Sequence, residues 1–131
     1  MIVGIGLDLV AIERIGELRR RRGERFVRRV FTEGERDACL GRAEPDPSLA
    51  ARFAAKEAAM KALGTGWGEG VGWHDVEVVS ERGRPPRLAL HGAAAARGAG
   101  LGVDTVHLSL THDAGVAGAV VVLERRRGEP A

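Results

Sequence analysis

The stretch SLAARFAAKEAAMKALG, residues 48–64, predicts the long helix on which the fold depends. We expect Asp46 as its N-cap, Pro47 as its first helical residue and Gly64 as the residue that ends it. Alanines occupy most of its faces, so little polar surface remains and the helix should be largely buried. Its charged side chains therefore need partners or a chemical role.

Glu57 and Lys61 are two charged residues that this helix presents together. They are four positions apart and lie on one face, which Gly64 shares. The ordinary interpretation is an ion pair that faces solvent and contributes roughly 0.2–0.5 kcal/mol. That interpretation fits poorly here, because Phe53 and Met60 flank the same face.

The N-terminal segment, residues 2–10, is predicted to form a buried strand. Gly4, Gly6 and Asp8 share one face of it by the two-residue alternation of a strand. Two glycines leave that face without side chains, so something must approach the backbone closely, which favours a ligand beside Asp8. A carboxylate in an apolar strand is costly to bury unless it is paired or binds a metal. The alternative is an acid at the strand end that caps the following turn.

Asp8 and Glu57 together suggest a metal site. Both offer hard oxygen ligands, and Mg²⁺ usually takes one or two carboxylates, several waters and substrate phosphates. Lys61 would then supply a positive charge to a phosphate oxygen. The sequence has no Cys/His cluster with metal spacing, no P-loop motif and no G-x-S-x-G elbow, so those chemistries are not indicated.

The remaining elements follow in mixed order rather than in strict alternation. This order predicts an α+β fold in one small domain over residues 1–124, with a mostly antiparallel sheet and a long central helix, followed by a flexible basic tail at 125–131. Further helices are expected at 11–29, which Gly23 could break, at 32–40 behind a Thr32–Glu35 capping box, and at 93–99; further strands are expected at 76–79, 87–90, 106–111 and 116–123.

The composition is that of a soluble globular protein, with 44% apolar and 29% charged residues in a chain of 131. The N-terminus MIVGIGLDLV has no basic segment and contains an acid, which argues against a signal peptide. No apolar run reaches the ~20 residues of a membrane span. We therefore expect a cytoplasmic protein, in which the single cysteine, Cys39, is a small buried residue.

Positive charge is concentrated near the N-terminus. Eight arginines and three glutamates lie between Glu13 and Arg29. This basic segment is either a solvated helix face or a surface for an acidic partner, with Phe26 as an apolar anchor. Nucleic acid fits less well as the partner, because aromatics make up only 4% of the chain and single-strand binders use aromatic platforms.

Three segments resemble bacterial holo-acyl carrier protein synthase, a small 4′-phosphopantetheinyl transferase. They are GIGLDLVAIERI at 4–15, ARFAAKEAAMKALGTG at 51–66 and HLSLTHDAGVAGAVVVLE at 107–124. They occur in the family's order and at its usual distances. The intervening FTEGE and the strand–turn–strand around GRPP are also similar, so the resemblance covers nearly the whole chain.

The resemblance implies transfer of 4′-phosphopantetheine from coenzyme A to a serine of apo acyl carrier protein, with adenosine 3′,5′-bisphosphate as the second product. Asp8 and Glu57 match the family's metal-binding acids, which would hold Mg²⁺ on the pyrophosphate. Either Glu57 or a metal-bound water would take the serine proton. Lys61 matches the family lysine at the pyrophosphate, and Gly64 is included with the coenzyme A contacts.

Arg52 and His112 match family positions associated with the 3′-phosphate of coenzyme A. By helical geometry Arg52 is not on the Glu57 face, so it must reach the nucleotide end or a neighbouring subunit. The family is a homotrimer with its sites at subunit interfaces, which would let His112 come from the adjacent chain. On its own, the segment around His112 predicts no more than a β-hairpin whose end carries a histidine.

In the family, the helix after the first strand docks the acidic surface of the carrier protein. The residues expected at that contact here are Arg14, Leu18, Arg21, Arg25, Phe26 and Arg28. The alternative from another functional class is a basic module that binds nucleic acid or an acidic protein without chemistry. That alternative leaves Asp8 and the Glu57–Lys61 pair unexplained.

Overall fold

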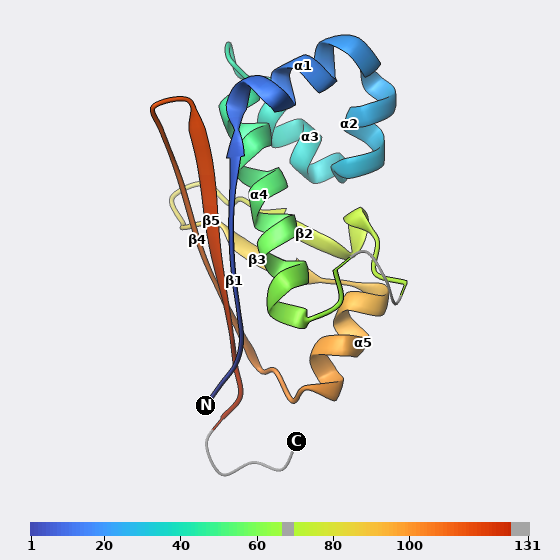
Figure 1. The fold of residues 1–131 in the computed structure, drawn as a ribbon, viewed down its shortest axis with the longest axis vertical. Coiled ribbons are helices and arrows are strands. Elements are labelled where there is room, and N and C mark those ends of the chain that lie inside the picture. Colours follow the sequence, from blue (N-terminus) through green and yellow to red (C-terminus); the bar gives the residue numbers. More distant parts are fainter. Residues whose placement is uncertain (67–69, 127–131) are drawn as a thin grey trace.

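The computed structural model describes residues 1–66 and 70–126, in which a long helix packs on one face of a three-stranded sheet (Figure 1). Both sheets are antiparallel, which confirms the predicted α+β fold with its long central helix. In chain order the elements are β1 (Ile2–Ala11), α1 (Ile12–Arg22), α2 (Glu24–Val30), α3 (Glu33–Leu40), α4 (Asp46–Leu63), the 3-10 turn η1 (Trp73–Asp75), β2 (Val76–Val79), β3 (Arg87–Leu90), α5 (Gly92–Gly100), β4 (Thr105–Asp113) and β5 (Val116–Glu124).

The larger sheet has the strand order β1–β5–β4, so the first strand pairs with the last. In its register Asp8 pairs with Ala119, and Ala119 pairs on its other side with Leu110. These three residues therefore lie on the same face of the sheet. The smaller sheet contains β2 and β3 alone, with Val76 opposite Leu90.

The glycines of β1 are covered by α4, and the prediction that their bare face favours a ligand is wrong. A side chain at Gly4 would meet the carbonyl oxygen of Ala62, and one at Gly6 would meet that of Ala58. Glycine on the strand and alanine on the helix thus let the two backbones approach closely. The glycines are needed for helix packing.

The boundaries of α4 differ from the prediction at one end. Asp46 is the first helical residue rather than the N-cap, because Pro45 occupies the cap position. The Asp46 carboxylate instead accepts a hydrogen bond from Arg19 Nε at 2.7 Å, which ties α4 to α1. At the other end Gly64 adopts a left-handed conformation, with φ of 75°, and terminates the helix as predicted.

The N-terminal helices also follow the sequence signals. Gly23 separates α1 from α2 and has a φ of 59°, a conformation that glycine adopts without strain. The capping box of α3 is present: Glu35 N donates to Thr32 Oγ1, and Thr32 N donates to Glu35 Oε1. Cys39 is fully buried on α3, as expected.

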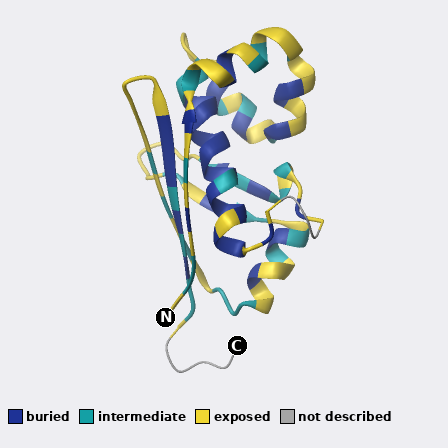
Figure 2. Ribbon diagram, viewed as in Figure 1, coloured by how far each residue is buried: buried dark blue, intermediate teal, exposed yellow. Residues whose placement is uncertain are grey.

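Most of α4 is buried along its length (Figure 2). The opposite face of the three-stranded sheet is not covered. Ile5, Leu7 and Leu9 of β1 point there and are 66%, 62% and 67% exposed. An apolar row of this kind is typical of a surface that another molecule covers.

The predicted tail falls partly within the described residues. Arg125 N donates to the carbonyl oxygen of Met1, and the Met1 amine donates to the carbonyl oxygen of Arg125. Arg126 N donates to Asp104 Oδ2. The rest of the predicted tail, 127–131, lies outside the described residues. Within the described part of the chain, no helix combines the length and the apolarity that crossing a bilayer requires.

We expect Gly6→Ala to lower the free energy of unfolding by about 1–3 kcal/mol, because the added methyl group would overlap the Ala58 carbonyl oxygen. Chemical denaturation followed by circular dichroism measures the change. Gly100→Ala is the matched control, since nothing lies within 4 Å of its added methyl group at the end of α5. The control should keep or slightly raise stability. A Gly6→Ala protein as stable as wild type would contradict the close packing of α4 on β1.

Candidate active site

Asp8 lies on the face of β1 that α4 covers, next to Lys61. Lys61 Nζ donates to Asp8 Oδ1 at 3.0 Å and to the backbone oxygen of Leu7 at 3.0 Å. The Asp8 side chain is largely buried, whereas that of Lys61 is half exposed. The structure therefore brings together two of the three residues predicted to be catalytic, and Lys61 links the helix to the strand.

Glu57, the third predicted catalytic residue, lies one helical turn before Lys61 and is partly buried. Loss of solvation raises the pKa of Glu57 above its usual value, and repulsion from the Asp8 carboxylate raises it further. The positive charges of Lys61 and Arg14 oppose this rise. Asp8 and Glu57 are thus close enough for their charges to interact.

Two interacting carboxylates can share a divalent cation, because its charge removes their mutual repulsion. In residues 1–66 and 70–126, no group of three or more His, Cys, Asp and Glu side chains is arranged to hold a metal ion. Asp8 and Glu57 could therefore supply two oxygen ligands to an ion whose remaining ligands are water and substrate. They do not form a closed protein cage.

A basic groove of about 490 Å³ runs along α1 and α2 to Glu57. Its apolar part includes Phe53 of α4 and Trp73, whose rings lie 5.1 Å apart. Four arginines give it a strong positive charge next to the candidate base. The residues that line the groove are Arg14, Leu18, Arg22, Arg25, Phe26, Arg29, Val30, Phe53, Glu57 and Trp73.

Four of the six predicted docking residues line this basic groove: Arg14, Leu18, Arg25 and Phe26. Sequence reasoning selected Arg21 and Arg28 for the same face, but the groove has Arg22 and Arg29 in their place. The signal that could have found them is helical spacing, because positions 14, 18, 22, 25 and 29 follow a repeat of three to four residues. Arg21 instead lies 3.5 Å from Glu17 on the surface of α1.

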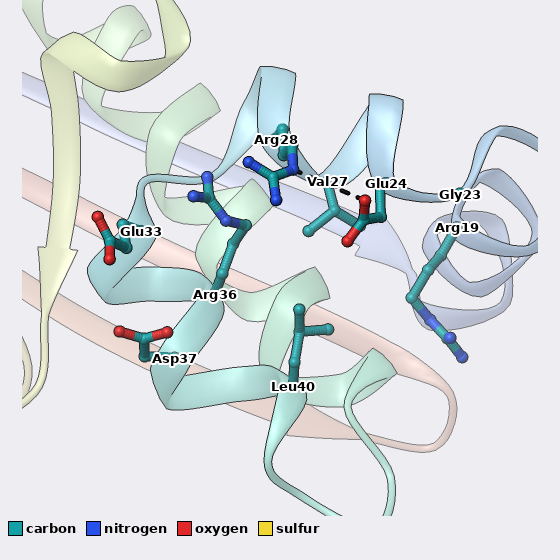
Figure 3. Close-up of a pocket in the computed structure, with 9 residues that line it drawn as sticks. All are labelled: Arg19, Gly23, Glu24, Val27, Arg28, Glu33, Arg36, Asp37 and Leu40. Carbon is teal, nitrogen blue, oxygen red and sulfur yellow. Dashed lines mark ion pairs between the residues drawn. The ribbon is translucent and has the colours of Figure 1, made fainter.

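Arg28 lines a separate cavity of about 570 Å³ between α2 and α3 (Figure 3). Its Nε lies 3.8 Å from Glu24 Oε2, the ion pair drawn there as a dashed line. The lining contains three arginines and three acids, so this cavity lacks the excess positive charge of the basic groove. Its residues are Arg19, Gly23, Glu24, Val27, Arg28, Glu33, Arg36, Asp37 and Leu40.

Arg52 and His112, the two residues expected at a phosphate, line one cavity of about 560 Å³. Arg52 is 5% exposed and donates to Ser48 Oγ at 2.6 Å and to Ser80 Oγ at 2.7 Å. These bonds aim its guanidinium toward the turn after β2. The remaining lining residues are Arg42, Glu44, Pro47, Ser48, Ala51, Ser80, Glu81, Arg84, Pro86, Leu110 and Thr111.

The cavity lined by Arg52 and His112, which we call the Arg52 cavity, is distinct from the Asp8–Glu57 site. Arg52 and Glu57 are five residues apart, about 140° around the helix, and they line different cavities. The structure thus brings Arg52 to His112, and Asp8 to Glu57 and Lys61. Gly64 lies further along, at the end of α4, with Arg97 Nε donating to the neighbouring carbonyl of Leu63.

Sequence reasoning missed a buried ion pair beside the site. Lys56 and Glu35 are each 0% exposed, and Lys56 Nζ lies 2.7 Å from Glu35 Oε1. Glu35 was interpreted as part of a capping box, which it is, and that role hid its second partner. The available signal was a lysine in an alanine-rich helix that has few exposed positions.

The comparisons with known proteins cover nearly the whole chain. A family model described as 4′-phosphopantetheinyl transferase superfamily matches residues 4–109. A holo-[acyl-carrier-protein] synthase from Solibacter usitatus is 48% identical over 124 residues, which are 95% of this chain and 99% of that protein. Another from Anaeromyxobacter sp. strain K is 54% identical over 128 residues, 95% of this chain and 97% of that one.

Solved structures give the same result. The holo-[acyl-carrier-protein] synthase of Neisseria meningitidis superposes with a TM-score of 0.86 at 33% identity, covering 95% of this chain and all of that one. The Helicobacter pylori enzyme, solved in complex with coenzyme A, superposes with a TM-score of 0.80 at 31% identity, covering 92% of this chain and 99% of that one.

We expect Asp8→Asn to lower the pKa of Glu57, because the neutral amide removes the repulsion of a neighbouring carboxylate. The pKa should stay above its usual value, since burial is the larger cause of the rise. Carbon-13 NMR titration of the glutamate side-chain carboxyl groups measures it. Asp37→Asn on α3 is the control and should leave Glu57 unchanged. An unaltered Glu57 titration in Asp8→Asn would show that the two carboxylates are not coupled.

Proposed function

The chain belongs to the 4′-phosphopantetheinyl transferase superfamily, and we infer that it transfers the 4′-phosphopantetheine moiety of coenzyme A to a serine of apo acyl carrier protein. The products are holo carrier protein and adenosine 3′,5′-bisphosphate. One observation carries this inference from the structure: Asp8, Glu57 and Lys61 converge beside the basic groove. Those groups suit a reaction at a pyrophosphate, and the groove suits an acidic protein substrate.

We propose Mg²⁺ as the ion that Asp8 and Glu57 hold. Burial and then repulsion from Asp8 raise the pKa of Glu57, and a cation bound to both carboxylates would relieve that repulsion. Carboxylate oxygens are the hard ligands that magnesium prefers. When bound between them, Mg²⁺ would neutralise charge that develops on the pyrophosphate oxygens. Loose coordination by two acids leaves room for water and phosphate, which magnesium retains in its shell.

Lys61 and Glu57 have separate roles in this proposal. The Lys61 ammonium has three donors, and its two bonds to β1 leave one N–H to orient a phosphate oxygen. Glu57, which lines the groove, takes the serine proton. The serine oxygen then bonds to the phosphorus on the pantetheine side, and the P–O bond to the adenosine bisphosphate breaks.

We assign the 3′-phosphate end of coenzyme A to the Arg52 cavity. Arg52 and His112 can donate to phosphate oxygens there, and Arg42 and Arg84 add positive charge. The volume of about 560 Å³ falls in the usual range of small-molecule sites. Because the Arg52 cavity and the Asp8–Glu57 site lie on different sides of α4, we propose that coenzyme A bridges two neighbouring chains.

A homotrimer with its sites at the subunit interfaces would supply such neighbouring chains. The exposed row Ile5, Leu7 and Leu9 on the uncovered sheet face supports this assembly, because burying it against another chain removes apolar surface from water. Val120 and Val122 of β5 lie on the same face by the strand register, which extends the apolar surface.

The carrier protein is proposed to dock in the basic groove. Arg14, Arg22, Arg25 and Arg29 provide charge for an acidic partner, while Leu18 and Phe26 provide apolar contact. The groove ends at Glu57, so a carrier bound there would present its serine to the candidate base.

The central test mixes the protein with coenzyme A, Mg²⁺ and apo acyl carrier protein and measures the mass of the carrier. We expect a mass gain equal to phosphopantetheine, its loss when the metal is chelated, and a rate at least about 100-fold lower in Glu57→Gln. Glu17→Gln on the exposed face of α1 is the matched control and should react at the normal rate. An unmodified carrier with the wild-type protein would refute the function, and normal turnover by Glu57→Gln would refute its role.

Reversing two charges of the basic groove tests carrier docking. Arg14→Glu/Arg25→Glu should raise the KM for the carrier by about tenfold or more, because repulsion replaces attraction, with little change in the KM for coenzyme A. The control Arg21→Glu/Arg28→Glu makes the same change of net charge outside the groove. Equal effects of the two double variants would mean that docking depends on overall charge and not on this groove.

A charge on the open sheet face tests the trimer. Leu7→Asp should convert a particle of three chains into single chains, because the carboxylate cannot be buried without a partner. Light scattering coupled to size-exclusion chromatography gives the mass. Leu40→Asp, at an exposed leucine on α3, is the control and should remain trimeric. A wild-type protein with the mass of a single chain would contradict the proposed trimer.

A further inference from the structure

Lys56 and Glu35 form an ion pair that is cut off from solvent, next to the groove but outside its lining. Burial lowers the pKa of Lys56, while the charge and hydrogen bond of Glu35 oppose that fall. Glu35 is therefore the main partner that favours the charged form of Lys56. Burying such a pair is expensive, and an apolar pair of similar size would often serve stability as well or better. Stability alone does not account for these two residues.

All three donors of the Lys56 ammonium are used, and they connect separate segments. Besides Glu35, Lys56 Nζ bonds to the carbonyl oxygens of Trp73 at 2.9 Å and of Val76 at 2.6 Å. Glu35 Oε2 in turn accepts from Val78 N at 2.9 Å. The pair thus ties the start of α3, the η1 turn and β2 to one position on α4.

That position immediately precedes Glu57. Lys56 points into the protein and Glu57 toward the groove, because successive helical residues differ by about 100°. Trp73, whose carbonyl Lys56 holds, packs its ring on Phe53 and lines the groove together with Glu57. The hydrogen bond from Lys56 therefore fixes Trp73, whose ring forms one wall of the groove, relative to the turn of α4 that carries Glu57.

We propose that Lys56, held by Glu35, is a positioning residue. It sets the distance between Glu57 and the Trp73 ring across the groove, and so places the serine of the carrier protein for reaction. The proposal rests on the proposed function. Lys56 touches neither substrate nor metal; it acts through Trp73. Its loss should harm the reaction of the carrier more than the binding of coenzyme A.

The first test compares Lys56→Met with Leu123→Ala, a core variant of β5, the strand beside β1, that does not line the groove. We expect Lys56→Met to lower kcat/KM for the carrier at least tenfold and to change the KM for coenzyme A less than twofold. Leu123→Ala should lower the unfolding midpoint and leave kcat/KM for the carrier within threefold. If Lys56→Met keeps carrier kcat/KM within threefold, the proposal is overturned.

A second variant separates positioning from stability. Lys56→Met/Glu35→Gln removes both charges and keeps an amide oxygen that can accept from a backbone N–H of Thr32 or Val78, so it should unfold at a higher denaturant concentration than Lys56→Met. The backbone oxygens of Trp73 and Val76 still lack their donor, so we expect the kinetic defect to remain. Recovery of carrier kcat/KM together with stability would show a purely structural role and reject the proposal.

The fluorescence of Trp73 reports the surroundings of its ring without an activity measurement. The sequence has two tryptophans, so Trp67→Phe leaves Trp73 as the single emitter. In that background Lys56→Met and the double variant should shift Trp73 emission to longer wavelength, and Leu123→Ala should not. Unshifted emission in both Lys56 variants would contradict the proposal. If the wild-type protein fails to modify the carrier but the emission shifts, the proposed function fails while the link from Lys56 to Trp73 stands.

Discussion

The close approach of α4 to β1 is the constraint on which the rest of the structure depends. The two backbones come closest at the glycines, with Gly4 against Ala62 and Gly6 against Ala58. The residues just before those alanines are Lys61 and Glu57, so backbone contacts fix the helix positions from which both side chains project. Asp8 follows two residues after Gly6 on the same face of the strand. Backbone packing therefore determines where Glu57 and Lys61 start relative to Asp8.

The charges of α4 show how a largely buried helix can serve several sites at once. Successive positions point about 100° apart, so Arg52, Lys56 and Glu57 leave the helix in different directions. Each charge has its own partners. Arg52 donates hydrogen bonds to two serine hydroxyls, and Lys56 bonds to Glu35 and two backbone carbonyls. The positive charges of neighbouring side chains partly offset the charge of Glu57. For each of the three, at least one partner comes from outside α4: Ser80 for Arg52, Glu35 for Lys56 and Arg14 for Glu57. The same contacts that make the charges tolerable therefore also hold the elements around the site.

Sequence reasoning predicted most elements to within a residue or two, because glycine breaks, the Thr32–Glu35 capping box and strand alternation are local signals. It also selected Asp8, Glu57 and Lys61, which the structure brings together. It could not determine what covers the β1 glycines, because a bare strand face suits a ligand and a helix equally. Nor could it find the Lys56–Glu35 pair, whose members are 21 positions apart and meet only through tertiary packing.

The two faces of β1 link assembly to chemistry. Asp8 lies on the face toward α4, while Leu7 and Leu9 beside it lie on the open face. Because side chains alternate, a shift of one residue in the β1–β5 register would exchange the two sets, placing Asp8 outside and the leucines against α4. A neighbouring chain packed on the open face would oppose that shift, since its contacts need the leucines where they are. Such a neighbour would then hold Asp8 in place through the strand itself, without touching its carboxylate.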